Sequence, residues 1–219
     1  MSRPLLILLE GSNDLEFLLR LAARLRPDLP HLPDLRQWQA EGRIVLVPLG
    51  GGDPASWPDR LRALGHPEFH LYDREQQPET DVRQQAVAKV NARPGCRAAL
   101  TAKRSLENYL HPVAIQAAGG GDLAFGDDDP VSLLLASRWY SEQAPEVPWG
   151  ALARRAQRRL AARAKRWLNS VAVAQMTADL LAVRDPTGEL LGWLQTIAEL
   201  ANSSREPTRS PCGALRLLP

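Results

Sequence analysis

The chain has 219 residues, of which 44% are hydrophobic and 24% charged, and its formal net charge is +2. This length and apolar content suit one large domain with a core of its own, or one domain with a small helical addition. The two cysteines, Cys96 and Cys212, lie far apart, which excludes a cysteine-rich structural zinc site and fits a reducing compartment. The apolar run before Glu10 is too short for a signal peptide, and no later segment reaches eighteen apolar residues. We therefore expect a cytoplasmic protein with no membrane partner.

Short apolar runs alternate with helical patterns in the first half of the chain. The predicted strands are residues 5–9, 43–49, 69–72 and 96–101. The predicted helices are residues 12–25, 54–64, 81–90 and 112–118. This βαβαβαβ order predicts an α/β fold with a mostly parallel, four-stranded, Rossmann-like sheet and helices on both faces.

The pattern changes after residue 118. Residues 119–130 are rich in Gly and Asp, and no further strand signal follows. Helical patterns cover residues 131–140, about 149–183 and about 188–201, so we expect an all-helical C-terminal extension. The predicted organisation is a sheet domain at 1–118, a helical extension at 119–202, and a poorly ordered tail at 203–219.

Acidic side chains follow three of the four predicted strands. Glu10 ends the first strand, with Asp14 in the next helical turn, Asp73 and Glu75 follow the third, and Glu107 lies beyond the fourth. Because ligands of open α/β sheets bind at the carboxyl ends of the strands, we expect these carboxylates to gather at one edge. Gathered carboxylates repel one another unless a cation neutralises them, and Mg²⁺ prefers oxygen ligands of this kind. The pattern therefore predicts a metal site suited to phosphoryl chemistry.

The order of these motifs resembles the Toprim domain and, within it, the branch found in OLD-family (overcoming lysogenization defect) nucleases. The resemblance covers about residues 4–115. It rests on Leu8-Leu9-Glu10-Gly11 with Asp14, on Tyr72-Asp73-Arg74-Glu75, and on Lys103-Arg104-Ser105-Leu106-Glu107-Asn108-Tyr109-Leu110. Glu75 stands where Toprim proteins usually have Asp. The chain also lacks a phosphate-binding P-loop, so the ATPase of OLD proteins would be a separate subunit or absent.

The resemblance implies a Toprim-type endonuclease that hydrolyses DNA phosphodiester bonds with two Mg²⁺ or Mn²⁺ ions. The implied metal ligands form two groups, Glu10, Asp73 and Glu75 for one ion and Asp14 and Glu107 for the other. Lys103 would stabilise charge on the scissile phosphate, which makes Lys103 and Glu10 the expected catalytic residues.

Residues 149–168 form the most basic segment of the chain, with six arginines, one lysine and no acid, a local charge of +7. The segment is rich in Ala, Leu and Arg and should be helical. Arg155, Arg159 and Arg163 recur at a spacing that aligns them along one side of this helix. A row of guanidinium groups suits phosphates. The expected nucleic-acid contacts are Arg154, Arg155, Arg158, Arg159, Arg163, Lys165 and Arg166.

Other functions stay open at the level of the sequence. The chain could be a non-catalytic Toprim-like subunit that binds nucleic acid or regulates a separate ATPase, or a primase-like nucleotidyl transferase, and RNA is an alternative to DNA. A phosphoacceptor receiver domain also groups acids at strand ends. A receiver needs a lysine after a fifth strand, however, and only four strands are predicted here.

Overall fold

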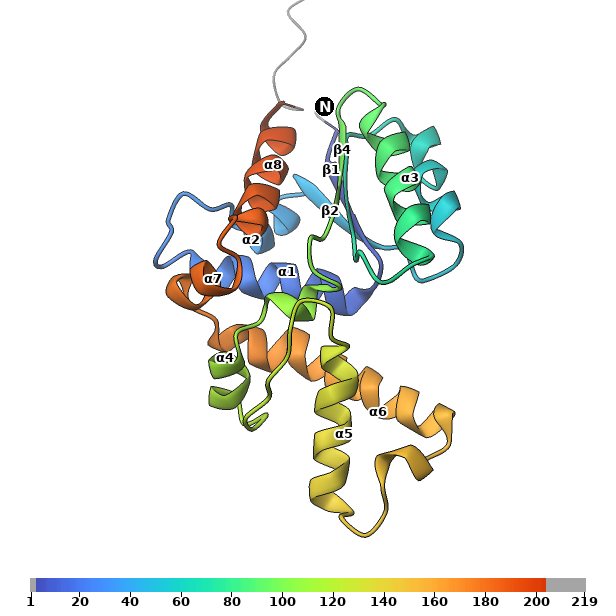
Figure 1. The fold of residues 1–219 in the computed structure, drawn as a ribbon. Coiled ribbons are helices and arrows are strands. Elements are labelled where there is room, and N and C mark those ends of the chain that lie inside the picture. The colour runs from blue at the N-terminus through green and yellow to red at the C-terminus, as the bar shows by residue number, and fades with distance from the viewer. Residues whose placement is uncertain (1–2, 204–219) are drawn as a thin grey trace, which may run out of the picture.

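The computed structural model describes residues 3–203 and contains a four-stranded, all-parallel sheet (Figure 1). The strand order is β2 (Ile44–Pro48), β1 (Leu5–Leu9), β3 (Glu68–Tyr72) and β4 (Cys96–Leu100). The predicted α/β fold with a parallel sheet and a helical C-terminal region is thereby confirmed. The predicted tail lies outside the described residues, apart from Ser203.

The sheet aligns the carboxyl ends of its strands. Leu9 pairs with Pro48 on one side and with Leu71 on the other, and Leu71 pairs with Ala99. All five residues of β1 and of β3 are buried, which explains the continuous apolar sequence of β1, while β3 also buries Glu68 and His70. Residues that follow β1, β3 and β4 therefore emerge at the same edge of the sheet.

Helices cover both faces of the sheet (Figure 1). On one face, Leu5, Ile7 and Leu9 pack into a large core with α1 (Ser12–Leu25) and α8 (Glu189–Ser203), and α2 (Leu35–Ala40) lies beside β2. On the other face, Leu6 and Leu8 belong to a smaller core beneath α3 (Glu79–Asn91). The alternation follows from the two-residue period of a strand.

The segment at 54–64 differs from the single helix that the sequence predicts. It forms two short 3₁₀ helices, Pro54–Asp59 and Arg62–Leu64. Pro58 lies inside the first and has no backbone N–H to donate, which prevents a continuous α-helix. Gly65 ends the second with a φ of 63°, in the left-handed region.

The C-terminal region contains α4 (Pro112–Ala117), α5 (Val131–Gln143), α6 (Arg154–Trp167), α7 (Ala178–Arg184) and α8. A π-helical turn at Leu168–Ala172 and a 3₁₀ turn at Val173–Gln175 separate α6 from α7, so the helix predicted at about 149–183 is interrupted. Short 3₁₀ turns also occur at Leu106–Tyr109 and Trp149–Ala151.

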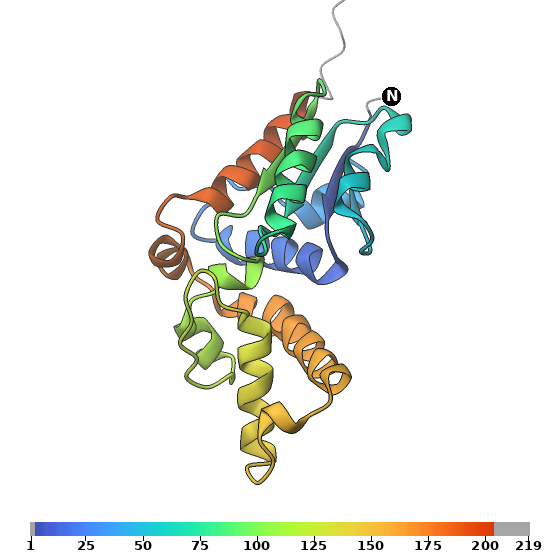
Figure 2. The same cartoon turned by 45° about the vertical axis from the view of Figure 1, so that its right-hand side comes forward.

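Part of the C-terminal helical region packs directly against the sheet. Helix α8 packs against β1, β3 and β4, and one hydrophobic core runs from the sheet into the C-terminal helices. The α5–α6 pair instead extends away from the sheet (Figure 2). Among residues 3–203, no helix combines the length and the apolar character that crossing a membrane requires.

Candidate functional site

Three of the predicted acidic residues converge at the carboxyl edge of the sheet. Asp73 follows β3, Glu107 lies in the 3₁₀ turn after β4, and Asp14 lies in the first turn of α1. All three are buried, with 2–4% of their surface exposed. Each carboxylate lies within 4 Å of the ammonium of Lys165, at 2.8 Å for Asp14, 3.7 Å for Asp73 and 3.6 Å for Glu107. The three carboxylates are called the acidic cluster below.

Local hydrogen bonds hold two of these carboxylates in place. Asp73 Oδ1 accepts the backbone N–H of Leu106 at 3.1 Å, which fixes the end of β3 to the turn after β4. Glu107 Oε2 accepts the hydroxyl of Ser105 at 2.8 Å. Each residue thus has one oxygen bound by its surroundings and its other oxygen within reach of Lys165.

Two buried oxygens of the acidic cluster have no hydrogen-bond donor besides the Lys165 ammonium in the described part of the chain. These are Asp14 Oδ1 and Glu107 Oε1, the two atoms whose distances to Lys165 Nζ are given above. Gly11 permits the close approach of Asp14, since a Cβ at Gly11 would lie 3.2 Å from Asp14 Oδ2. Buried carboxylate oxygens cost free energy unless a donor or a cation faces them, so these two oxygens mark a place where a cation is favoured.

Burial and mutual repulsion shift the titration of this group. Burial raises the pKa of Asp73 well above its usual range, and the Lys165 ammonium only partly offsets that rise. Burial likewise raises the pKa of Asp14. Burial by itself would lower the pKa of Lys165, but Glu107, Asp73 and Asp14 together raise it well above its ordinary value. Lys165 therefore keeps its proton in this position, and one cation faces three acids.

Glu10 lies at the margin of the acidic cluster and has its own cation. Arg83 of α3 makes two contacts to its carboxylate, from Nε at 2.8 Å and from Nη2 at 3.2 Å. The Glu10 charge still contributes to the raised pKa of Asp73, after burial and nearer groups. Glu10 is thus close enough to act on the cluster electrostatically, while Arg83 holds its orientation.

Glu75 is directed elsewhere. Its φ of 55° lies in the left-handed region, which is uncommon for a residue with a side chain. Its backbone N–H donates to the carbonyl of Arg104 at 2.9 Å, and its carboxylate lies 3.4 Å from the Arg104 guanidinium. In this arrangement the second acid of the Asp-x-acid motif pairs with Arg104.

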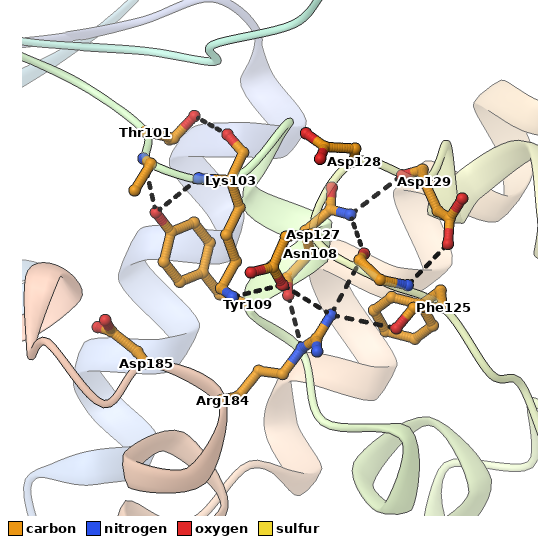
Figure 3. Close-up of polar contacts among 12 residues, drawn as sticks. Thr101, Lys103, Asn108, Tyr109, Phe125, Asp127, Asp128, Asp129, Arg184 and Asp185 are labelled. Carbon is orange, nitrogen blue, oxygen red and sulfur yellow. Dashed lines mark hydrogen bonds and ion pairs between the residues drawn. The ribbon is translucent and has the colours of Figure 1, made fainter.

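Lys103, the predicted catalytic lysine, contacts an acid from a different segment. Its Nζ lies 2.5 Å from Asp127 Oδ1, and Arg184 of α7 approaches the same oxygen at 3.5 Å (Figure 3). Asn108 donates to the carbonyls of Gly126 and Asp129 at 2.9 and 3.0 Å. In this arrangement Lys103 secures the loop around residue 127.

The cation that meets the acidic cluster is instead Lys165, which the sequence places in the phosphate-binding row. Its side chain is 29% exposed and points to Asp14. Two neighbours on α6 and its continuation, Ala164 and Leu168, are fully buried, so this side of the helix faces the protein. The sequence signal for this inward position of Lys165 is that it is the single lysine of an arginine-rich helix and follows the buried Ala164.

The six arginines of α6 are exposed, and no residue of the described part of the chain pairs with their guanidinium groups. They are Arg154, Arg155, Arg158, Arg159, Arg163 and Arg166. Within residues 3–203, none of their guanidinium groups forms an ion pair or a hydrogen bond, in contrast to Arg20, Arg83 and Arg138. Like charges this close repel one another, so this surface favours an anionic partner.

Within the described residues, no group of three or more His, Cys, Asp and Glu side chains is arranged to hold a metal ion. The geometry suggests why: the Lys165 ammonium lies among the acidic cluster, while Glu10 and Glu75 contact arginines. The donor set itself suits a hard divalent cation, because it offers carboxylate oxygens of which two are buried with no donor besides the Lys165 ammonium among residues 3–203. Comparison of the chain with protein-family models, with curated proteins and with solved structures finds no match.

Proposed function

We propose that this chain is a cytoplasmic, divalent-metal-dependent nuclease of the Toprim type found in OLD proteins, which hydrolyses DNA phosphodiester bonds. The observation that carries the proposal is the acidic cluster, three buried carboxylates at the carboxyl edge of a parallel sheet with a single ammonium among them. The unpaired arginines of α6, the same helix that carries Lys165, supply a surface for the phosphate backbone.

Asp14, Asp73 and Glu107 are the residues that would hold Mg²⁺ or Mn²⁺, with Glu10 beside them. Bound there, two such ions would activate water and neutralise the leaving oxygen. Asp14 Oδ1 and Glu107 Oε1, the two oxygens that face the Lys165 ammonium, could turn to a metal ion once that ammonium withdraws. Arg83 would keep the Glu10 carboxylate oriented toward this edge.

Lys165 must give up its position among the carboxylates when the site is loaded. Its side chain is long and 29% exposed, so the ammonium can withdraw toward solvent without unfolding α6. A lysine in contact with solvent is protonated at neutral pH, so the withdrawn ammonium keeps its charge. A charged ammonium at the rim of the cluster would face the scissile phosphate, a role that the Toprim resemblance implies for Lys103.

Cleavage of supercoiled plasmid DNA with Mg²⁺, with Mn²⁺ and with EDTA tests the proposal. We expect cleavage with either ion, and Asp73→Asn or Asp14→Asn should reduce it to the background level because each removes a charged oxygen donor. Asp59→Asn is the matched control, since Asp59 is an exposed acid outside the acidic cluster. Full activity of both cluster variants would exclude this assignment.

A second candidate function is a non-catalytic DNA-binding subunit of a separate ATPase. The position of Lys165 favours it, because an ammonium already neutralises part of the acidic cluster. In that case the chain binds DNA through α6, neither ion induces cleavage, and calorimetry detects no Mg²⁺ or Mn²⁺ binding. Binding of the ions without cleavage would instead indicate that the ATPase partner is needed for activity.

A further inference from the structure

A cavity of about 300 Å³ lies between α5 and α6, in the part of the molecule that extends away from the sheet (Figure 2). Its lining is mainly aromatic and apolar, with two polar side chains. The main lining residues are Trp139, Tyr140, Gln143, Leu160, Arg163 and Trp167. None of them belongs to the acidic cluster, so the cavity is a separate feature.

The aromatic side chains that line the cavity pack against one another and remain partly exposed to solvent. Trp139 and Trp167 meet edge to face, with ring centroids 5.2 Å apart and an interplanar angle of 81°. Gly120 allows Trp167 its place, because a Cβ there would lie 2.9 Å from Trp167 Cη2. Trp139, Tyr140 and Trp167 all keep part of their surface exposed. The cavity therefore offers flat aromatic surface to a ligand.

The surroundings of the cavity are strongly positive. Arg163 lines it and is exposed, and among the described residues its guanidinium has neither an ion pair nor a hydrogen bond. Arg159 and Arg166 lie one turn away on the same helix and are likewise exposed and unpaired. A ligand that fits here should combine a flat ring with a negative charge.

We propose that this cavity binds one unpaired nucleobase of a single-stranded nucleic acid, with the adjoining phosphate on Arg163. A nucleotide has the flat ring and the attached anion that the cavity and its rim call for, and bases stack well on aromatic side chains. Gln143 and Arg163 can donate hydrogen bonds to the edge of the base. A cavity of this size is at the small end of ligand sites, which suits one base.

The cavity would position a strand near the acidic cluster. Arg163 and Trp167 lie two positions before and after Lys165 on α6, an axial offset of about 3 Å. The cavity and the cluster thus lie on different sides of one helix at the same level. The proposal rests on the nucleic-acid substrate of the proposed function but requires no metal and no cleavage.

The test compares two single-stranded oligonucleotides of twelve nucleotides in EDTA, by fluorescence anisotropy. One carries normal bases, and the other has the same phosphates with abasic sugars throughout. We expect wild-type protein to bind the normal strand about 5- to 150-fold more tightly, the range of one stacked base. Equal affinities for the two strands would overturn the proposal, whatever the outcome of the plasmid assay.

Variants of the cavity residues test whether the preference for the strand with normal bases arises in the cavity. Trp139→Leu and, independently, Tyr140→Leu should reduce the preference for the normal strand while leaving binding of the abasic strand almost unchanged. Trp38→Leu is the matched control, because Trp38 is a partly exposed tryptophan that packs on Arg43 far from the cavity. If both cavity variants keep the full preference and circular dichroism shows them folded, the base binds elsewhere and the proposal is wrong.

Discussion

Lys165 is the residue on which the electrostatics of the acidic cluster depend. Three buried carboxylates share its ammonium, and two of their oxygens have no other hydrogen-bond donor in the described structure. Removing one partner of a buried ion pair is costly because the other charge stays uncompensated. A divalent ion placed among the same carboxylates would restore the balance.

Lys165→Met should therefore destabilise the protein in EDTA and make it more responsive to divalent ions. We expect the free energy of unfolding in urea at pH 8 to fall by about 3 kcal/mol. The loss should be smaller at pH 5, since carboxyls whose pKa is already raised take up protons when the lysine is absent. Addition of Mg²⁺ should raise the melting temperature of the variant more than that of wild type.

Lys89→Met is the control for this substitution, because Lys89 is exposed on α3 and has no ion pair within the described residues. It should change stability by less than about 0.5 kcal/mol. If Lys165→Met is as stable as wild type and insensitive to Mg²⁺, the acidic cluster neither needs a cation nor binds one.

The sequence predicted only part of this arrangement at the level of residues. Asp14, Asp73 and Glu107 could be placed together because each follows a strand whose carboxyl end lies at the same edge. The cations could not be placed, since Lys165 comes from a helix remote in sequence and Arg83 from the middle of α3. Which lysine meets which acid depends on helix packing, and that packing has no short-range sequence signal.

At the scale of single elements, alternate residues on one face of strand β3 form a buried row of hydrogen-bonded polar side chains. The Tyr72 hydroxyl donates to His70 Nδ1 at 2.6 Å, and His70 Nε2 donates to Glu68 at 2.7 Å. Arg93 contacts the same Glu68 oxygen at 2.5 Å. Burial lowers the pKa of His70 despite Glu68. Burial would raise the pKa of Glu68, but the hydrogen bonds from His70 and Arg93 lower it.

His70→Gln should therefore change the pH dependence of stability. The lowered pKa means that unfolded His70 binds a proton more readily, so wild type loses stability as the pH falls below about 6.5. The variant does not lose stability in this way, because glutamine does not take up a proton. At pH 8 we expect it to be about 1–3 kcal/mol less stable, because Tyr72 and Glu68 lose well-placed partners. This difference should shrink between pH 7 and pH 5 in urea titrations, and a constant difference would contradict the assignment.

Helix α6 is the element expected to meet nucleic acid. Changing Arg155, Arg158 and Arg159 together to Gln keeps the helix propensity close to the original. If all three contact phosphates of duplex DNA, the slope of log affinity against log salt should flatten by about 2–3. The melting temperature should change little, because these side chains are exposed and unpaired.

A second triple variant separates this effect from the change in net charge. Arg62, Lys89 and Arg97 are exposed and lie on other elements, so their joint change to Gln removes the same charge elsewhere. We expect its salt slope to match wild type. If both triple variants reduce the slope equally, the long-range charge of the molecule attracts DNA and α6 has no special role.

The elements themselves were predictable to the extent that local signals decided them. Short strand signals marked all four strands, and the clearest is the apolar run of β1, which is buried on both faces. The prediction of a single helix at 54–64 was wrong because Pro58 lies inside the helical pattern and cannot donate a backbone hydrogen bond. The helix expected across 149–183 is interrupted where buried residues such as Leu168, Ala172 and Val173 pack into the core, and packing of this kind is set by distant neighbours.

At the scale of the whole molecule, the sheet and the last helix form one unit. The sequence suggests a sheet domain ending near residue 118, but α8 covers the face of β1, β3 and β4. Leu190, Leu194 and Ile197 of α8 are fully buried in the core that contains Leu5 and Ile7. Burying three such side chains contributes roughly 5–9 kcal/mol, which is comparable to the whole stability of a typical domain.

A fragment of residues 1–118 should therefore not fold, although it contains all four strands and all five predicted metal ligands. Without α8 the apolar side of the sheet is exposed, and the Lys165 ammonium is also missing from the acidic cluster. We expect the fragment to unfold without a cooperative transition in urea, whereas the full chain shows one. The point variant Leu194→Ala of the full chain should keep a cooperative transition but lose about 2–5 kcal/mol, as buried leucines do. A fragment that unfolds cooperatively and binds Mg²⁺ would instead show that residues 1–118 form an independent domain and that α8 merely covers it.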